Sequence, residues 1–130
     1  MPLYGNELSR DLTPYDAGLG RVVKLDKAAE FVGRQALADR AAQAARRVLV
    51  GLTGLTRRVP RHGYAVLWDG KPSGLVTSGA HSPTLGKPIG LALLPTKATA
   101  VGTEFGVEIR GREAAARVVP TPFYKRSDKP

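Results

Sequence analysis

The densest cluster of residue types that could do chemistry lies in residues 74–83, where Ser78, His81 and Ser82 are close in sequence. A serine beside a histidine is the pairing of a nucleophile with its general base. The cluster does not complete such a site, because it holds no carboxylate to orient His81 and no G-x-S-x-G turn. We therefore expect the hydroxyl groups of Thr77, Ser78 and Ser82 to form hydrogen bonds with backbone groups in a turn instead.

Other catalytic chemistries are limited by residue types that the chain lacks. The sequence has 0 cysteines and 2 histidines, His62 and His81. A thiolate nucleophile, a disulfide and a cysteine-ligated zinc site are therefore excluded, and the two histidines could not fill a zinc site alone. His62 is predicted to be an exposed loop residue. Glu104 and Glu108 fall on one face of a predicted strand, a spacing more typical of a solvated face than of acid/base catalysis. We predict no catalytic residue and no metal site in these residues.

Positive charge is the strongest remaining signal. Of the 130 residues, 20 are Lys or Arg and 11 are Asp or Glu, which gives a net charge of +9. Residues 41–103 hold most of the excess, with Asp69 as their sole acidic residue. The predicted partner-binding residues are the arginines of this segment: Arg46, Arg47, Arg57, Arg58 and Arg61. A solvated basic face, an acidic protein and nucleic acid all remain open as explanations. Few aromatic residues lie nearby, which favours an acidic protein over nucleic acid.

The elements that must position these residues change character at Arg47. From there the apolar pattern has a period of two, with Gly or Pro every few residues, which is typical of a small all-β unit. We predict strands over residues 47–52, 65–68, 71–78, 89–94, 104–109 and 112–119, forming a barrel or a jelly-roll-like sandwich. Asp69-Gly70 predicts a type I′ hairpin turn, and Arg110-Gly111 a weaker one.

The first forty-six residues do not resemble the start of an independent domain. Glycines and prolines divide them into short pieces whose apolar residues are too scattered to close a core. We predict one short strand over residues 19–26, Asp26 as an N-cap, and a packing helix from Ala28 or Gly33 to Ala45. The predicted fold class is thus α+β and mainly β, with residues 1–46 as the end of an incomplete domain and residues 47–130 as the barrel.

The order of short motifs along the chain resembles the C-terminal third of aminomethyltransferase, the T-protein of the glycine cleavage system. The N-terminal motifs are MPLYGNEL at residues 1–8, TPYDAGLG at 13–20, VVKLDK at 22–27 and FVGRQAL at 31–37. The C-terminal motifs are GLVTSG at 74–79, IGLA at 89–92 and VPTPFY at 119–124. The resemblance covers essentially the whole chain, in order and at close spacing.

This resemblance implies an activity that the chain would share with a longer protein. T-protein takes the aminomethyl group from the lipoyl arm of H-protein, releases ammonia and passes the carbon to tetrahydrofolate. In the family the catalytic aspartate, and the glutamate and arginine that hold the folate, lie in parts that precede the motifs found here. We therefore expect the sequence to be a C-terminal fragment that is inactive alone.

The resemblance also implies folate contacts and a partner. Tyr4 closely follows the family's folate arginine, Arg126 lies in a tail that reaches back toward folate in some members, and Tyr124 is a weaker third candidate. The implied partner is lipoylated H-protein, an acidic protein that the arginines would dock, with no nucleic acid and no membrane. The implied compartment is the bacterial cytoplasm, or the mitochondrial matrix in a eukaryote.

Two other hypotheses compete with this one. A stand-alone basic β-barrel that binds RNA or an acidic protein would show the same charge pattern. Self-association through apolar surface in the partial N-terminal domain is the other.

Overall fold

The computed structural model describes residues 2–43 and 45–126. Along the chain, its helical elements are η1 (Gly20–Val22), α1 (Arg34–Ala41) and η2 (Thr96–Ala98). Its strands are β1 (Arg47–Gly54), β2 (Ala65–Trp68), β3 (Lys71–Ser82), β4 (Lys87–Pro95), β5 (Glu104–Ile109) and β6 (Arg112–Val119). Within these described residues, no helix has the length and apolar content needed to cross a membrane.

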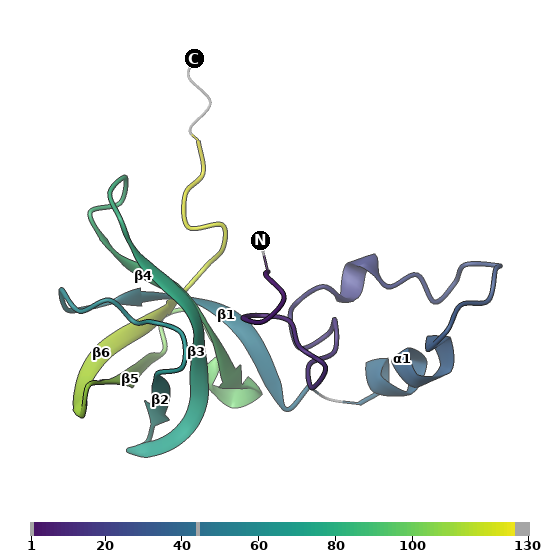
Figure 1. Ribbon diagram of the computed structural model, residues 1–130, viewed down its shortest axis with the longest axis horizontal. Helices are drawn as coiled ribbons and strands as arrows, with labels where there is room; N and C mark the ends of the chain where they lie inside the picture. Colours follow the sequence, from purple (N-terminus) through teal and green to yellow (C-terminus); the bar gives the residue numbers. More distant parts are fainter. Residues whose placement is uncertain (1, 44, 127–130) are drawn as a thin grey trace.

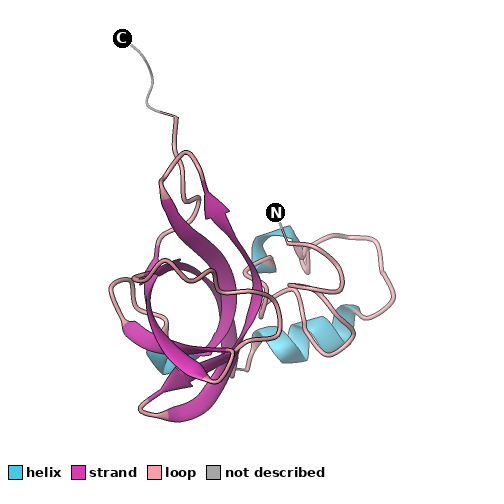
Figure 2. Cartoon of the chain, turned by 60° about the vertical axis from the view of Figure 1, so that its left-hand side comes forward, coloured by secondary structure: helices cyan, strands magenta, loops and turns pink. Residues whose placement is uncertain are grey.

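The six strands close into one antiparallel barrel with the order β1-β4-β3-β2-β5-β6 (Figures 1 and 2). This confirms the predicted barrel and removes the jelly-roll alternative. Three strands have the predicted bounds, and β1, β3 and β4 are longer than predicted. The extra length of β3 and β4 belongs to their hairpin, whose pairing continues to Ser82 opposite Lys87.

Alternation of side chains fills the barrel interior. In β6 the residues Ala114, Ala116 and Val118 are buried, whereas the residues between them are exposed. In β5, Phe105, Val107 and Ile109 face the same core. Large side chains from one strand thus meet small ones from its neighbour, which lets a narrow barrel fill without cavities.

Both predicted hairpin turns are present. Asp69 and Gly70 have φ angles of 51° and 71°, and Arg110 and Gly111 have 53° and 72°. Two consecutive positive φ angles are the mark of a type I′ turn, whose twist matches that of the flanking strands. The second turn directs Arg110 and Arg112 toward one end of the barrel.

The N-terminal segment, residues 2–46, differs from its prediction. No strand forms in residues 19–26, where the structure has the 3-10 helix η1. A strand requires a partner, and residues 19–26 pair with no edge of the barrel; the start of β1, which β6 does not cover, bonds to Asp16 instead. The helix α1 is shorter than predicted and buries no residue, so the prediction of a packing helix is wrong. Its N-cap is Gly33, with φ of 87° and no side-chain cap, rather than Asp26.

Candidate functional site

The arginines predicted as one docking patch lie at two ends of the barrel. Arg47 begins β1 and pairs with Pro95, whereas Arg57, Arg58 and Arg61 follow the other end of the same strand. The eight residues of β1 make seven steps of about 3.3 Å, so the strand that separates the two groups is roughly 23 Å long. All five side chains are exposed, and Arg46 belongs with Arg47. A single contact patch containing all five is therefore not formed.

A pocket collects two of these arginines with two that the sequence analysis did not select. Arg58 and Arg61 come from the β1–β2 loop, residues 55–64, and Arg110 and Arg112 from the β5–β6 hairpin. The cavity between them has a volume of about 520 Å³, and Val59, Tyr64 and Ile109 complete its lining. We call it the arginine pocket. Figure 1 shows the loop and the hairpin on the side of the barrel away from α1.

The β1–β2 loop is held against β3 by closely spaced contacts. The Gly63 N–H donates to Val76 O at 2.9 Å, and the Val76 N–H donates to Tyr64 O at 2.9 Å. His62 Nδ1 lies 2.8 Å from Thr77 O. Because a carbonyl oxygen only accepts, this nitrogen must carry the hydrogen. His62 is exposed as predicted, yet it fastens the loop that carries the pocket arginines.

Gly79 makes the closest approach between the loop and β3. A Cβ atom built on Gly79 would lie 1.8 Å from Pro60 O, so only glycine fits there. Arg61 Nη1 donates to Gly79 O at 3.3 Å, which directs the Arg61 side chain. Thr77 and Gly79 of the GLVTSG motif thus form the surface of β3 that the β1–β2 loop contacts. The prediction that the Thr77 and Ser78 hydroxyls serve a turn is wrong, because β3 continues through both residues to Ser82.

The candidate nucleophiles of residues 74–83 are structural. Thr77 is buried and its hydroxyl donates to Leu91 O at 3.1 Å. Ser82 accepts the Leu85 N–H at 3.2 Å in the β3–β4 turn, which is the turn role predicted for it. His81 is exposed and pairs with Pro88 across the hairpin. No acid–base pair joins these side chains among the described residues.

The carboxylates of β5 also lack an acid/base arrangement. Glu104 and Glu108 are exposed on one face, as predicted, and Glu104 accepts from Arg117 Nε at 3.1 Å. Across residues 2–43 and 45–126, no three His, Asp or Glu side chains cluster in a way that could hold a metal ion.

The three residues predicted to contact folate are exposed. Tyr4 has 74% and Tyr124 has 57% of its surface accessible, and Arg126 is also exposed. No hydrogen bond or ion pair connects them in the described part of the chain. Their contact with folate stays a prediction, because a folate site would need further residues besides these three. Leu3, Val22 and Val32 also expose apolar surface on the N-terminal segment, which leaves self-association a prediction.

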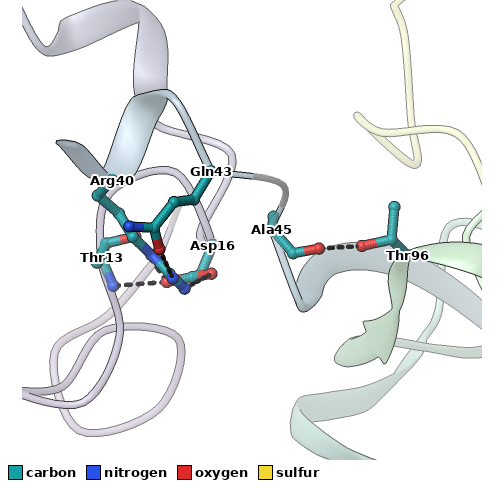
Figure 3. Close-up of polar contacts among 6 residues, drawn as sticks. All are labelled: Thr13, Asp16, Arg40, Gln43, Ala45 and Thr96. Atoms are coloured by element: carbon teal, nitrogen blue, oxygen red, sulfur yellow. Dashed lines mark hydrogen bonds and ion pairs between the residues drawn. The ribbon is translucent and has the colours of Figure 1, made fainter. Parts of the chain in front are cut away.

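The sequence analysis missed two buried acids of the N-terminal segment, Asp16 and Glu7. Asp16 connects parts of this segment to one another and to the barrel. Asp16 is 3% exposed and accepts hydrogen bonds from the Thr13 N–H at 2.8 Å and the Thr13 hydroxyl at 2.6 Å. Arg40 Nη2 of α1 reaches Asp16 Oδ1 at 3.3 Å, as Figure 3 shows. The Asp16 backbone carbonyl accepts the Leu49 N–H of β1 at 2.9 Å. Asp16 therefore connects α1 to the first barrel strand. The Thr-x-x-Asp spacing was the available sequence signal.

A second connection to the barrel runs through Ala45 and Thr96. The hydroxyl of Thr96, the first residue of η2, donates to the Ala45 carbonyl (Figure 3). This contact fixes the chain just before β1 begins. The N-terminal segment is thus attached at the end of the barrel opposite the arginine pocket.

Glu7 is the other buried acid. It is 1% exposed, and Oε2 accepts the Leu3 N–H at 2.9 Å, while Oε1 has no hydrogen-bond partner within the described residues. Burial raises the pKa of Glu7, but the Leu3 amide and the nearby Ser78 and Thr77 hydroxyls outweigh it and lower the pKa below its ordinary value. The Ser78 and Thr77 hydroxyls lie near the carboxylate but do not form a hydrogen bond with Oε1. The carboxylate thus organises the start of the N-terminal segment through Leu3, close to the hydroxyls of Thr77 and Ser78 in β3.

We expect attachment of the N-terminal segment to weaken in acid. Burial raises the pKa of Asp16, but the Thr13 hydrogen bonds and the Arg40 charge lower it further, to below its ordinary value. A lowered folded-state pKa contributes stability above the unfolded pKa, and this is lost as pH falls below about 4. Asp16→Asn should cost about 1.5 kcal/mol at neutral pH.

Thermal unfolding between about pH 3 and pH 7 measures this effect. The acid-dependent loss should be smaller in Asp16→Asn than in the parent chain. Asp39→Asn is the matched control, because Asp39 is exposed on α1 and, within the described residues, its side chain accepts a hydrogen bond only from Gln35. Equal stability of the two variants at neutral pH would contradict the role given to Asp16.

Comparison with known proteins gives a consistent result over the whole chain. Residues 47–125 match the family model described as the glycine cleavage T-protein C-terminal barrel domain. The aminomethyltransferase of Streptomyces coelicolor is 59% identical over 130 residues, covering 97% of this chain and 35% of that protein. The aminomethyltransferase of Shouchella clausii is 51% identical over 127 residues, covering 98% of this chain and 35% of that protein.

A solved structure has the same fold. The glycine cleavage system aminomethyltransferase T from Bartonella henselae superposes with a TM-score of 0.88 at 34% identity. The match covers 95% of this chain and 35% of that one. The chain therefore spans about a third of the length of the relatives it matches.

Proposed function

Because this chain belongs to the glycine cleavage T-protein family and contains its C-terminal barrel domain, we propose that it serves the aminomethyltransferase reaction. In that reaction the aminomethyl carbon passes from the lipoyl arm of H-protein to tetrahydrofolate, and ammonia is released. The observation that carries the proposal is that the similarity runs through both the N-terminal segment and the barrel. A stand-alone RNA-binding barrel would not require the first forty-six residues, so that alternative is not favoured.

The described residues support a docking and scaffold role rather than the chemical step. They contain no pair of groups arranged to move a proton, and their two buried acids are engaged in holding the N-terminal segment. Tyr4, Tyr124 and Arg126 are free to contact tetrahydrofolate, the acceptor substrate, because their side chains are exposed. We propose that they contribute to a folate site whose other walls belong to further parts of a longer protein.

The proposed protein partner is lipoylated H-protein, and the proposed compartment is that of the bacterial cytoplasm. The pocket end of the barrel carries Arg57 as well as the four pocket arginines, so it suits an acidic partner. Arg46 and Arg47 lie too far from this end to share one small contact. They are therefore the weaker part of the predicted docking set.

A chimera tests the proposed function. The corresponding third of the Streptomyces coelicolor relative is replaced by residues 1–130 of this chain, and ammonia release from aminomethylated H-protein is measured with tetrahydrofolate. The chimera should keep the parent's kcat/KM within about tenfold, a change of about 1.4 kcal/mol in the barrier. The isolated 130-residue polypeptide should release no ammonia above the blank.

The control is the same relative with its C-terminal third deleted. Loss of activity in a chimera that folds like the parent would contradict the proposal. Turnover by the isolated polypeptide would contradict the expectation that the catalytic groups lie outside these residues.

A further inference from the structure

The arginine pocket has the chemistry of a binding site for carboxylates. We propose that it binds an acidic segment of a protein partner, with two or more carboxylate side chains among the arginines and an apolar side chain on Val59 and Ile109. The identity of the partner rests on the proposed function, whereas the binding chemistry does not. The proposal adds Arg110 and Arg112 to the docking surface and removes Arg46 and Arg47 from it.

Within residues 2–43 and 45–126, no acidic side chain neutralises the charges of the pocket. No ion pair to Arg58, Arg61, Arg110 or Arg112 is present in the described residues, where the three ion pairs involve other arginines. Arg61 uses one nitrogen on Gly79 O, which leaves the rest of its guanidinium free. Several unpaired guanidinium groups around one cavity form a field that attracts an anionic group. Their planar donor arrays suit bidentate binding of carboxylates.

The nearby acids face away from the pocket. Glu108 and Glu113 are directly opposite one another in the β5–β6 hairpin and are exposed. Glu113 packs over Gly106 on the outer face of the barrel. Arg112 has the same parity as the buried Ala114, so it continues the inward-facing row to the mouth of the barrel. Alternation along the strand therefore places the arginine at the pocket and the glutamates outside it.

The lining of the pocket favours protein over nucleic acid. Tyr64 is its single aromatic residue, and the ring packs partly against the hydrophobic core instead of lying open. Base stacking on such a surface would be poor. Val59 is half-buried and offers apolar surface beside the charges, whereas Ile109 is 7% exposed and adds only a small apolar area to the lining. That combination fits a peptide in which acidic and apolar residues are mixed.

The pocket is also held in shape before any partner arrives. One wall is fixed to β3 through Gly79, His62 and Gly63, and the other is a type I′ hairpin with continuous pairing to Ile109 and Arg112. A preformed pocket avoids the entropy of ordering loops on binding. The free arginine side chains are then the main groups to be immobilised.

Isothermal titration of the full 130-residue chain with a synthetic peptide of glutamate pairs separated by leucine tests the proposal. Arg110→Glu with Arg112→Glu should weaken peptide binding by about tenfold, because two attractive charges become repulsive. The matched control is Arg46→Glu with Arg47→Glu, which makes the same change of net charge at the other end of the barrel. Its affinity should stay within about twofold of the parent, since the charges are separated by more than a Debye length.

Three results would overturn the proposal: no binding of the peptide by the parent chain, equal weakening by both double variants, or tighter binding of an oligouridylate than of the peptide at equal salt. Thermal unfolding verifies that each variant folds. If the hairpin variant does not fold, Arg58→Glu on the loop gives an independent reading, with a weakening of about threefold expected. An unchanged affinity in Arg58→Glu would equally count against the pocket.

The chimera separates this proposal from the proposed function. With Arg110→Glu and Arg112→Glu in an active chimera, the KM for H-protein should rise by about tenfold while kcat stays unchanged. An active chimera with an unaltered KM would show that the pocket proposal fails and the function stands. If the chimera is inactive but Arg110→Glu with Arg112→Glu still weakens peptide binding by the 130-residue chain, the proposed function fails and the pocket proposal stands.

Discussion

Gly79→Ala is expected to destabilise the barrel by about 3 kcal/mol, at the upper end of the usual effect of overpacking. The added Cβ would lie 1.8 Å from the backbone oxygen of Pro60, which is not the flexible end of a side chain. Either β3 or the β1–β2 loop must move. Because Pro60 is buried and its neighbours Arg61 and His62 bond to β3, the movement would break those contacts too.

Urea unfolding followed by the fluorescence of the single tryptophan measures this loss. Gly54→Ala is the matched control, since its Cβ would meet Pro88 Cβ at 3.2 Å, a contact that a small shift relieves. The control should lose much less stability than Gly79→Ala. Similar stabilities of Gly79→Ala and the parent chain would mean that the loop does not rest on β3 as described.

Leu94→Ala is expected to cost between about 2 and 5 kcal/mol, the range measured for large-to-small changes in tightly packed cores. Leu94 in β4 is fully buried in the barrel core. Truncation removes apolar contacts and leaves a cavity, which neighbouring strands of a closed barrel cannot easily collapse to fill. The loss adds the cost of the cavity to that of the missing apolar contacts.

The control for this change is Leu75→Ala in β3, the strand beside β4. Leu75 is 37% exposed, so truncation there removes less buried surface. The difference between the two free energies of unfolding measures the contribution of the core position. A loss at Leu75 as large as that at Leu94 would contradict the placement of the core inside the barrel.

The sequence predicted the barrel well because strand signals are local. Alternation in residues 104–109 and 112–119 gave β5 and β6 their bounds, and Asp69-Gly70 identified a turn that needs positive φ angles. Such features depend on neighbours along the chain, so they can be read without knowing the fold. The same motifs led to the family, which the comparisons confirm.

The N-terminal segment was predicted less well because its structure depends on distant contacts. Residues 19–26 have a strand-like pattern but no partner edge, and Asp26 has a capping side chain but no helix to cap. At Asp16 the Thr-x-x-Asp spacing indicates only a local hydrogen bond, and at Glu7 no local pattern indicates burial. A carboxylate becomes a buried connector only when a fold surrounds it, and no local pattern reports which surface that is.

Sequence alone determined the class of fold, the family and the excess of positive charge, because alternation, turn residues and charge are properties of short stretches. The tertiary structure decided which charges act together. The length of β1 separates Arg46 and Arg47 from Arg58 and Arg61, and the strand order of the closed barrel brings Arg110 and Arg112 beside the latter pair. Antiparallel pairing of β2 with β5 joins Val66 to Val107, so the composition of a binding surface depends on strand order rather than on spacing along the chain.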